Sequence, residues 1–185
     1  MASYDTKVTL AAHRGWRGKY PENTMLGFRK ALTLDIDAIE MDVHMTSDYR
    51  IVVCHDATLN RTTDKTGMIC KLTLDEVREA DAGIKFGEEF KGEKIPTFEE
   101  ILQRFAGRGI MNIHVKIWDV KLPDPMIQQI VELIRKYDAQ NHVYFMTTND
   151  QIIRQVMEYA PDIPCCVGWN GNKDPMSIVD RAIAL

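Results

Sequence analysis

The fold is most clearly indicated by residues 38–56, which read AIEMDVHMTSDYRIVVCHD. Two short apolar runs, at 38–43 and 51–54, are typical of buried β-strands. Asp48-Tyr49 lies between them and suits a tight connection. This stretch therefore predicts two successive strands, and polar residues stand inside the first of them and directly after the second.

Outside this stretch, apolar strand patterns alternate with helical patterns. Further strands are predicted at 8–12, 110–116, 142–146 and 163–167. Helices are predicted at 24–34, 97–105, 125–137, 149–159 and 175–184, with a short one at the capping box Thr73-Leu74-Asp75-Glu76. This alternation indicates an α/β fold with a parallel sheet wrapped by helices.

Two closures of such a sheet are open, a doubly wound sheet and a (β/α)₈ TIM barrel. The sequence has no glycine-rich phosphate loop after a strand, which disfavours a nucleotide-binding doubly wound sheet. A barrel uses about 250 residues, whereas this chain has 185. We therefore expect a single domain over residues 1–185, a barrel truncated after about six β/α units.

Composition excludes some classes of function. Hydrophobic residues make up 45% and charged residues 27% of the chain, as in ordinary globular proteins, and the net charge is −4. An acidic balance disfavours a nucleic-acid partner, because such binders carry a basic excess. No signal peptide or transmembrane segment is apparent, so we expect a cytoplasmic protein.

Charged or imidazole residues occupy the ends of four successive predicted strands, where active sites of parallel barrels lie. Glu40 and Asp42 are two residues apart, so both side chains point to one face. Two inward carboxylates repel each other unless a cation lies between them, and a hard divalent metal suits that place. Solvated carboxylates at an exposed strand end are the alternative.

Four more residues suggest chemistry at phosphorus. His13 and His55 are imidazoles that can give and take a proton near neutral pH, or else ordinary polar loop residues. Arg14 and Lys116 suit a phosphate group, or else are surface charges. A metal and two cations would offset charge on phosphorus while the histidines handle protons on the attacking and leaving oxygens.

The chain resembles the glycerophosphodiester phosphodiesterase family over about residues 10 to 118. The resemblance rests on the following motifs: His13-Arg14-Gly15, Pro21-Glu22-Asn23-Thr24 with Phe28 and Ala31, Glu40-x-Asp42-Val43 with Thr46 and Asp48, His55-Asp56, Leu59 with Arg61-Thr62-Thr63 and Gly67, Ile95-Pro96-Thr97, and Asn112-Ile113-His114-Val115-Lys116. It implies a (β/α)₈ barrel with a small insertion after strand three, here about 57–94.

The resemblance also implies an activity and roles. The reaction would be hydrolysis of a small-molecule glycerophosphodiester to glycerol 3-phosphate and an alcohol. His13 and His55 would be the acid/base pair, Arg14 and Lys116 would bind the substrate phosphate, and Glu40 and Asp42 would ligate Mg²⁺ or Ca²⁺.

One departure concerns the metal. The family has glutamate as third ligand where this chain has His114. An imidazole ligand would move the preference towards Mn²⁺, Zn²⁺ or Co²⁺ and away from Ca²⁺. The competing hypothesis is that His114 disables the site and leaves a catalytically silent barrel that binds a phosphodiester.

A second departure is length, because residues for strands seven and eight are lacking. We expect an incomplete gene product or fragment; a natural short form closed by dimerisation is the alternative. A further alternative for function is a phospholipase-D-like relative acting on lysolipids, which would need an apolar entry surface.

Overall fold

The computed structural model describes residues 9–117, 125–168, 171, 174 and 176–185. The strands are β1 (Ala11–His13), β2 (Ala38–Met45), β3 (Ile51–Val53), β4 (Ile110–Val115), β5 (Val143–Thr147) and β6 (Cys165–Val167). The α-helices are α1 (Met25–Ala31), α2 (Leu74–Glu79), α3 (Phe98–Phe105), α4 (Met126–Lys136), α5 (Asp150–Tyr159) and α6 (Met176–Ala184). Short 3₁₀ helices are η1 (Ile69–Lys71), η2 (Glu88–Phe90) and η3 (Gln140–His142). Val8 and Pro175, where two predicted elements begin, lie outside the described residues.

The strands form one sheet in the order β1-β2-β4-β5-β6, with β3 pairing on β2. All pairs along this order are parallel, which confirms the predicted α/β fold with a parallel sheet. The prediction that residues 51–54 form a third barrel strand is wrong, because β3 runs antiparallel to β2. A parallel connection needs a crossover of about a dozen residues, and only residues 46–50 separate these strands. Within the described part of the chain, the sheet is open between β1 and β6.

The two faces of the central strands differ in character. Every residue of β2 is buried, as expected of a parallel strand covered on both sides. Alternate side chains of β2 and β4 join the main hydrophobic core, namely Ile39, Met41, Val43, Met111, Ile113 and Val115. The intervening polar side chains therefore point to the opposite face.

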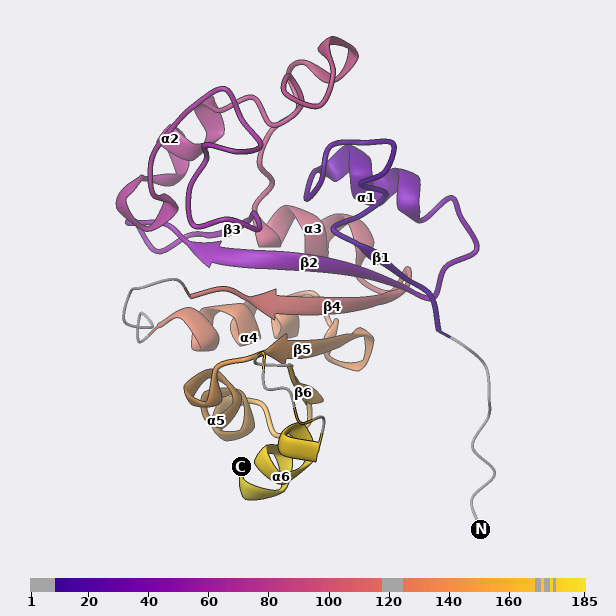
Figure 1. Ribbon diagram of the computed structural model, residues 1–185, viewed down its shortest axis with the longest axis vertical. Coiled ribbons are helices and arrows are strands. Elements are labelled where there is room, and N and C mark those ends of the chain that lie inside the picture. Colours follow the sequence, from indigo (N-terminus) through magenta and orange to yellow (C-terminus); the bar gives the residue numbers. More distant parts are fainter. Residues whose placement is uncertain (1–8, 118–124, 169–170, 172–173, 175) are drawn as a thin grey trace.

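Helices cover the apolar face of the sheet. In Figure 1, α3 and α4 lie behind β2 and β4. The buried residues of α3 follow helical spacing and are Phe98, Ile101, Leu102 and Phe105. Each such fully buried side chain stabilises the fold by roughly 1.5–3 kcal/mol. This packing fixes the orientation of β2 and β4, and with it the direction of their polar side chains.

Residues 57–94 form a second packing unit. Figure 1 shows this segment, with α2, above β2 in the view, on the side of the sheet where β3 pairs. Its buried apolar side chains form a separate cluster together with three residues that flank the segment, Val52, Cys54 and Ile95; the members within the segment are Leu59, Ile69, Val77, Ala80 and Ala82. Alternate residues of β3 join the main core instead, as Ile51 and Val53 do. The chain directly after β3 is thereby held between the two units.

Several helix starts follow their predicted caps. Thr73 and Thr97 each form a capping box at the start of α2 and α3. Asn149 accepts hydrogen bonds from the first turn of α5, as expected of an N-cap. Among the described helices, none combines the length and apolar character that a membrane crossing requires.

Candidate active site

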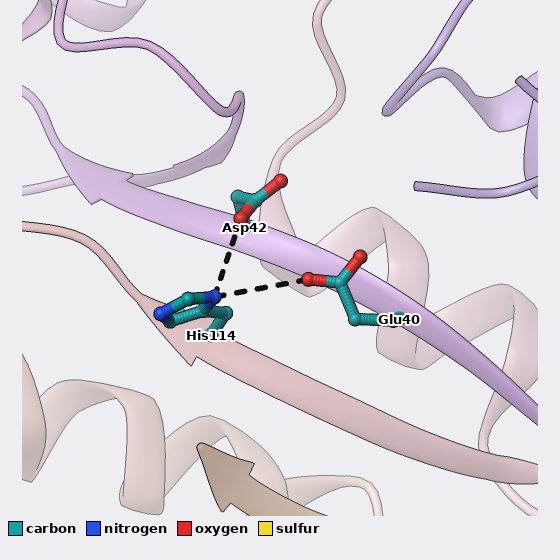
Figure 2. Close-up of side chains that lie close together, drawn as sticks. All are labelled: Glu40, Asp42 and His114. Atoms are coloured by element: carbon teal, nitrogen blue, oxygen red, sulfur yellow. Dashed lines mark ion pairs between the residues drawn. The ribbon is translucent and has the colours of Figure 1, made fainter. Parts of the chain in front are cut away.

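Neighbouring strands β2 and β4 bring three potential metal ligands together. Their register places Asp42 beside His114. One ligand atom from each of Glu40, Asp42 and His114 lies within 4.8 Å of the others, and Figure 2 shows the three side chains converging between the two strands. Nδ1 of His114 is 3.7 Å from Oδ1 of Asp42 and 4.0 Å from Oε1 of Glu40.

The two carboxylates fit a cation between them. The side chains of Glu40 and Asp42 are 5% and 0% exposed. Burial, followed by the charge of Asp42, raises the pKa of Glu40 to about 7. Oε1 of Glu40 and Oδ1 of Asp42 accept no hydrogen bond from the described residues, although Nζ of Lys116 forms an ion pair with the latter at 3.2 Å. Unsatisfied buried oxygens are costly, and a divalent ion would satisfy both.

His114 is suited to be the third ligand. Burial, followed by the positive charge of Lys116, lowers its pKa to about 4. The imidazole is therefore neutral near pH 7, which is the form that binds metals. Its Nδ1 faces both carboxylates, so the three donors form one group of two oxygens and one nitrogen.

Cations and an amide surround the buried Asp42. Nδ2 of Asn23 donates to Oδ2 of Asp42 at 3.0 Å, and Nε of Arg14 lies 3.4 Å from the same oxygen. Lys116 approaches the other oxygen. The two expected phosphate-binding cations thus lie on either side of a single carboxylate, next to the expected metal ligands.

The turn after β1 has an unusual backbone that delivers these groups. Arg14 and Asn23 both have positive φ angles, of 59° and 54°. Backbone N–H of Arg14 donates to Oε2 of Glu40 at 2.9 Å. Gly15 has a φ of 78°, and a Cβ there would lie 2.8 Å from the carbonyl carbon of Gly27. Strain of this kind is retained where surrounding contacts enforce it, often at functional sites.

His13 borders the carboxylates from the open side. Its side chain is 51% exposed, and Nε2 lies 3.7 Å from Oε2 of Glu40. Its pKa is lowered by partial burial and next by the charge of Arg14. A neutral, accessible imidazole beside these carboxylates can accept a proton from a ligand.

His55 reaches the same region by a route that differs from the one predicted. It follows an antiparallel strand, so the hairpin turns back and Cys54 N–H donates to the carbonyl of Asp42 at 2.9 Å. His55 therefore lies level with the middle of β2. Its backbone carbonyl is 3.1 Å from Nε2 of His44, a buried residue whose pKa is lowered to about 4, mainly by burial. Its ring contacts Asp56, with Nδ1 at 2.6 Å from Oδ1.

The structure brings six of the seven predicted site residues into direct contact with one another; the ring of His55 contacts Asp56 instead. Four residues had no role assigned from sequence, namely Glu22, Asn23, Asp56 and Arg61. Asn23 precedes a helix cap, where an amide is common without any ligand. The other three belong to the motifs that carry the family resemblance, but their positions in the sequence do not reveal that Arg61 pairs with both Glu22 and Asp56.

Fold and site together define a class of protein: an α/β protein with parallel strands, whose sheet carries a group of two carboxylates and one imidazole that could hold a metal ion, with Arg14, Lys116 and His13 beside it. The sequence matches the Glycerophosphoryl diester phosphodiesterase family over residues 13–180. The chain belongs to this family.

Known proteins resemble the chain in sequence and structure. It is 37% identical over 158 residues to a glycerophosphodiester phosphodiesterase of Caldanaerobacter subterraneus, covering 85% of this chain and 65% of that protein. It is 29% identical over 165 residues to a lysophospholipase D of Mus musculus, covering 83% of this chain and 49% of that protein. An Oleispira antarctica phosphodiesterase, solved in complex with the product sn-glycerol-3-phosphate, matches with a TM-score of 0.86 and 29% identity, over 98% of this chain and 73% of that one. The chain thus spans about two thirds of the Caldanaerobacter relative.

Proposed function

We propose that this chain carries the catalytic groups of a metal-dependent phosphoric diester hydrolase that cleaves glycerophosphodiesters to glycerol 3-phosphate and an alcohol. The observation that carries the proposal is the group of Glu40, Asp42 and His114, flanked by Arg14 and Lys116. Family membership supports it, as does the product found in the Oleispira antarctica relative.

Glu40, Asp42 and His114 would hold the ion. When bound, a divalent metal offsets negative charge that develops on the phosphoryl oxygens. Resemblance to the family implies Mg²⁺ or Ca²⁺. One imidazole among three ligands instead favours Mn²⁺, Zn²⁺ or Co²⁺, since Ca²⁺ prefers oxygen donors alone.

The protein's own groups would bind the phosphate and move protons. Arg14 offers a planar fork of donors and Lys116 a point charge, so both would hold phosphate oxygens. His13 and His55 would act as the acid/base pair, one taking a proton from the attacking oxygen and the other giving one to the leaving oxygen. Each imidazole has a carboxylate beside it: Glu40 lies beside His13, and Asp56 lies beside His55.

Two other functions remain as competing proposals. A phospholipase-D-like action on lysolipids is favoured by the likeness to the Mus musculus lysophospholipase D. A catalytically silent barrel that binds a phosphodiester would keep the cations but would have no need of paired imidazoles.

We further propose that the described sheet is part of a (β/α)₈ barrel, in a single domain over residues 1–185 with 57–94 as an insertion. Parallel strands whose apolar face is covered by helices and whose other face is polar support this proposal. A cytoplasmic location stays a prediction.

The function is tested by following release of glycerol 3-phosphate from glycerophosphocholine and glycerophosphoethanolamine, and of lysophosphatidic acid from lysophosphatidylcholine, with Mg²⁺, Ca²⁺, Mn²⁺, Co²⁺ or Zn²⁺. We expect metal-dependent turnover of the first two substrates that falls by at least about 10²-fold in His13→Ala. His142→Ala is the matched control, because His142 is an exposed residue of η3 remote from the site.

Each contrary outcome points to a different function. Production of lysophosphatidic acid from the lysolipid alone would favour the phospholipase-D-like activity. A folded chain that binds Mn²⁺ but turns over none of the three substrates would favour the silent binding barrel.

A further inference from the structure

Arg61 lies between two carboxylates and hydrogen-bonds to both. Its Nε and Nη2 donate to Asp56 at 2.8 and 3.1 Å. Its Nη1 and Nη2 donate to Glu22 at 3.0 and 2.7 Å. Glu22 is 39 residues away along the chain, so this guanidinium joins the 57–94 segment to the turn between β1 and α1.

Each of these carboxylates holds a residue of the proposed active site. Asp56 lies 2.6 Å from Nδ1 of His55, and Glu22 accepts from Nη1 of Arg14 at 3.2 Å. We propose that Arg61 is a positioning residue, which fixes the His55 imidazole and the Arg14 guanidinium relative to each other. For its effect on turnover, this inference rests on the proposed function.

The contact with Asp56 determines which nitrogen of His55 carries the proton in the neutral ring. Asp56 is ionised near neutral pH, and hydrogen bonds from Arg61, which also lower its pKa to about 2, hold both of its oxygens so that Oδ1 stays beside the ring. An ionised carboxylate only accepts hydrogen bonds. Nδ1 of His55 must therefore be the donor, which leaves Nε2 with the free lone pair that takes or returns a proton.

The contact of Arg61 with Glu22 affects Arg14, one of the two proposed phosphate-binding residues. Glu22 is held by Arg61 and Arg14 together, and its pKa is lowered by these contacts against the effect of burial. With Glu22 fixed, Nη1 of Arg14 is anchored at one end while its Nε lies beside Asp42. The guanidinium plane is thereby oriented at two points.

A purely structural role predicts something different. The side chain of Arg61 is 46% exposed, while those of Glu22 and Asp56 are 16% and 29% exposed, so these partly exposed ion pairs contribute only modestly to stability. Loss of Arg61 should therefore leave the fold intact while loosening two catalytic groups. If Arg61 only stabilised the fold, its loss would lower the stability and leave the tautomer of His55 unchanged.

The test compares Arg61→Gln and Arg61→Lys with a matched control, Arg135→Gln. Arg135 also forms a two-hydrogen-bond pair with a carboxylate, that of Asp162, on the surface at α4. The tautomer of His55 is measured by ¹⁵N NMR of histidine-labelled protein at about pH 8, above the ordinary titration range of imidazole. The His55 signals are identified by their loss in His55→Gln.

We expect a single His55 tautomer protonated at Nδ1 in the parent chain and in Arg135→Gln, but a mixture in Arg61→Gln. Arg61→Lys keeps the charge without the fork and should be intermediate. With the substrate that the chain turns over, kcat should fall roughly 10–100-fold in Arg61→Gln, as for other residues that orient catalytic groups. Thermal unfolding should stay close to that of Arg135→Gln.

An unchanged His55 tautomer in Arg61→Gln would overturn the inference, whatever happens to kcat. A large drop in thermal stability with that tautomer intact would show that Arg61 only stabilises the fold. The NMR measurement needs no substrate. A chain without turnover would therefore contradict the proposed function, while the His55 tautomer would still show whether Arg61 positions His55.

Discussion

Asp42 and His114 are directly paired in the parallel register of β2 and β4, and Oδ1 of Asp42 lies 3.7 Å from Nδ1 of His114. Side chains paired in this way on one sheet face are forced into proximity by the backbone. Strand register therefore places the imidazole beside the carboxylates. Any residue at position 114 would face the same two side chains.

That relationship predicts how His114→Glu changes metal binding. A third carboxylate supplies another oxygen donor and another negative charge, both of which Ca²⁺ prefers. We expect Ca²⁺ affinity to rise about 10-fold and the preference for Mn²⁺ or Zn²⁺ over Ca²⁺ to shrink. Calorimetric titration of the metal-free chain with each ion measures this without reference to activity.

His142→Glu is the control for the added charge, because His142 is exposed and outside the ligand group. Equal changes in Ca²⁺ affinity for the two variants would mean that the effect is one of net charge. An unchanged ion preference in His114→Glu would count against His114 as a ligand.

Much of the architecture was predictable because its signals are local. Capping boxes at Thr73 and Thr97 set the starts of α2 and α3 within a few residues of chain. The spacing of Glu40 and Asp42 fixed their common face through the strand period alone. Neither inference depends on what happens elsewhere in the fold.

Two features were not predictable in this way. The run at 51–54 is apolar on both faces, and such a pattern is the same for a parallel and an antiparallel strand. Its direction is decided by the connection of residues 46–50, which is too short for a parallel crossover, and not by the residues of the run itself. The contact of Arg61 with Glu22 joins two loops far apart in sequence, so it depends on the path of the whole 57–94 segment.

Glu40 should make the stability of the metal-free chain fall as pH rises. Its pKa in the fold, about 7, lies above its ordinary value of 4.5, so the folded state binds more protons than the unfolded state between these values. Stability from protonated Glu40 is fully present below about pH 4.5 and is lost as pH rises through 7. At about 1.4 kcal/mol for each pH unit, the loss approaches about 3 kcal/mol.

Glu40→Gln should remove this loss. Chemical denaturation at about pH 5 and pH 8 should show that the variant gains stability relative to the parent chain as pH rises. The comparison between variants cancels the opposite trend from His44 and His114, whose pKa values are lowered. The control Glu158→Gln, at an exposed position of α5, should show the same change in stability between pH 5 and pH 8 as the parent chain. If Glu40→Gln also shows the same change as the parent chain, the pKa of Glu40 is not raised by burial.

Gly15 should tolerate no side chain. Gly15 and Gly107 have nearly equal φ angles of 78° and 75°, but only Gly15 is crowded, with Gly27 backbone 2.8 Å from an added Cβ. Gly107→Ala should therefore cost about 1 kcal/mol for the left-handed backbone alone. Gly15→Ala adds a clash with fixed backbone and should cost roughly 3 kcal/mol. Equal losses in denaturant unfolding would show that the turn after β1 relaxes freely.

Lys116→Met should change the affinities for cations and for anions in opposite directions. Nζ of Lys116 lies 3.2 Å from Oδ1 of Asp42, where it competes with a metal ion for the same carboxylate oxygen. Removing its charge should raise Mn²⁺ affinity several-fold, about 3–10-fold, while glycerol 3-phosphate affinity falls about 10-fold. Titration calorimetry with Mn²⁺ and then with glycerol 3-phosphate measures both.

Lys71→Met, at an exposed position of η1, should leave both affinities as in the parent chain. The opposite signs matter, because a damaged fold would weaken both ligands together. If Lys116→Met weakens the binding of both Mn²⁺ and glycerol 3-phosphate, Lys116 is a structural counter-charge of Asp42 and not a phosphate ligand. A rise in Mn²⁺ affinity with unchanged glycerol 3-phosphate binding would instead remove Lys116 from the phosphate site and leave Arg14 as its cation.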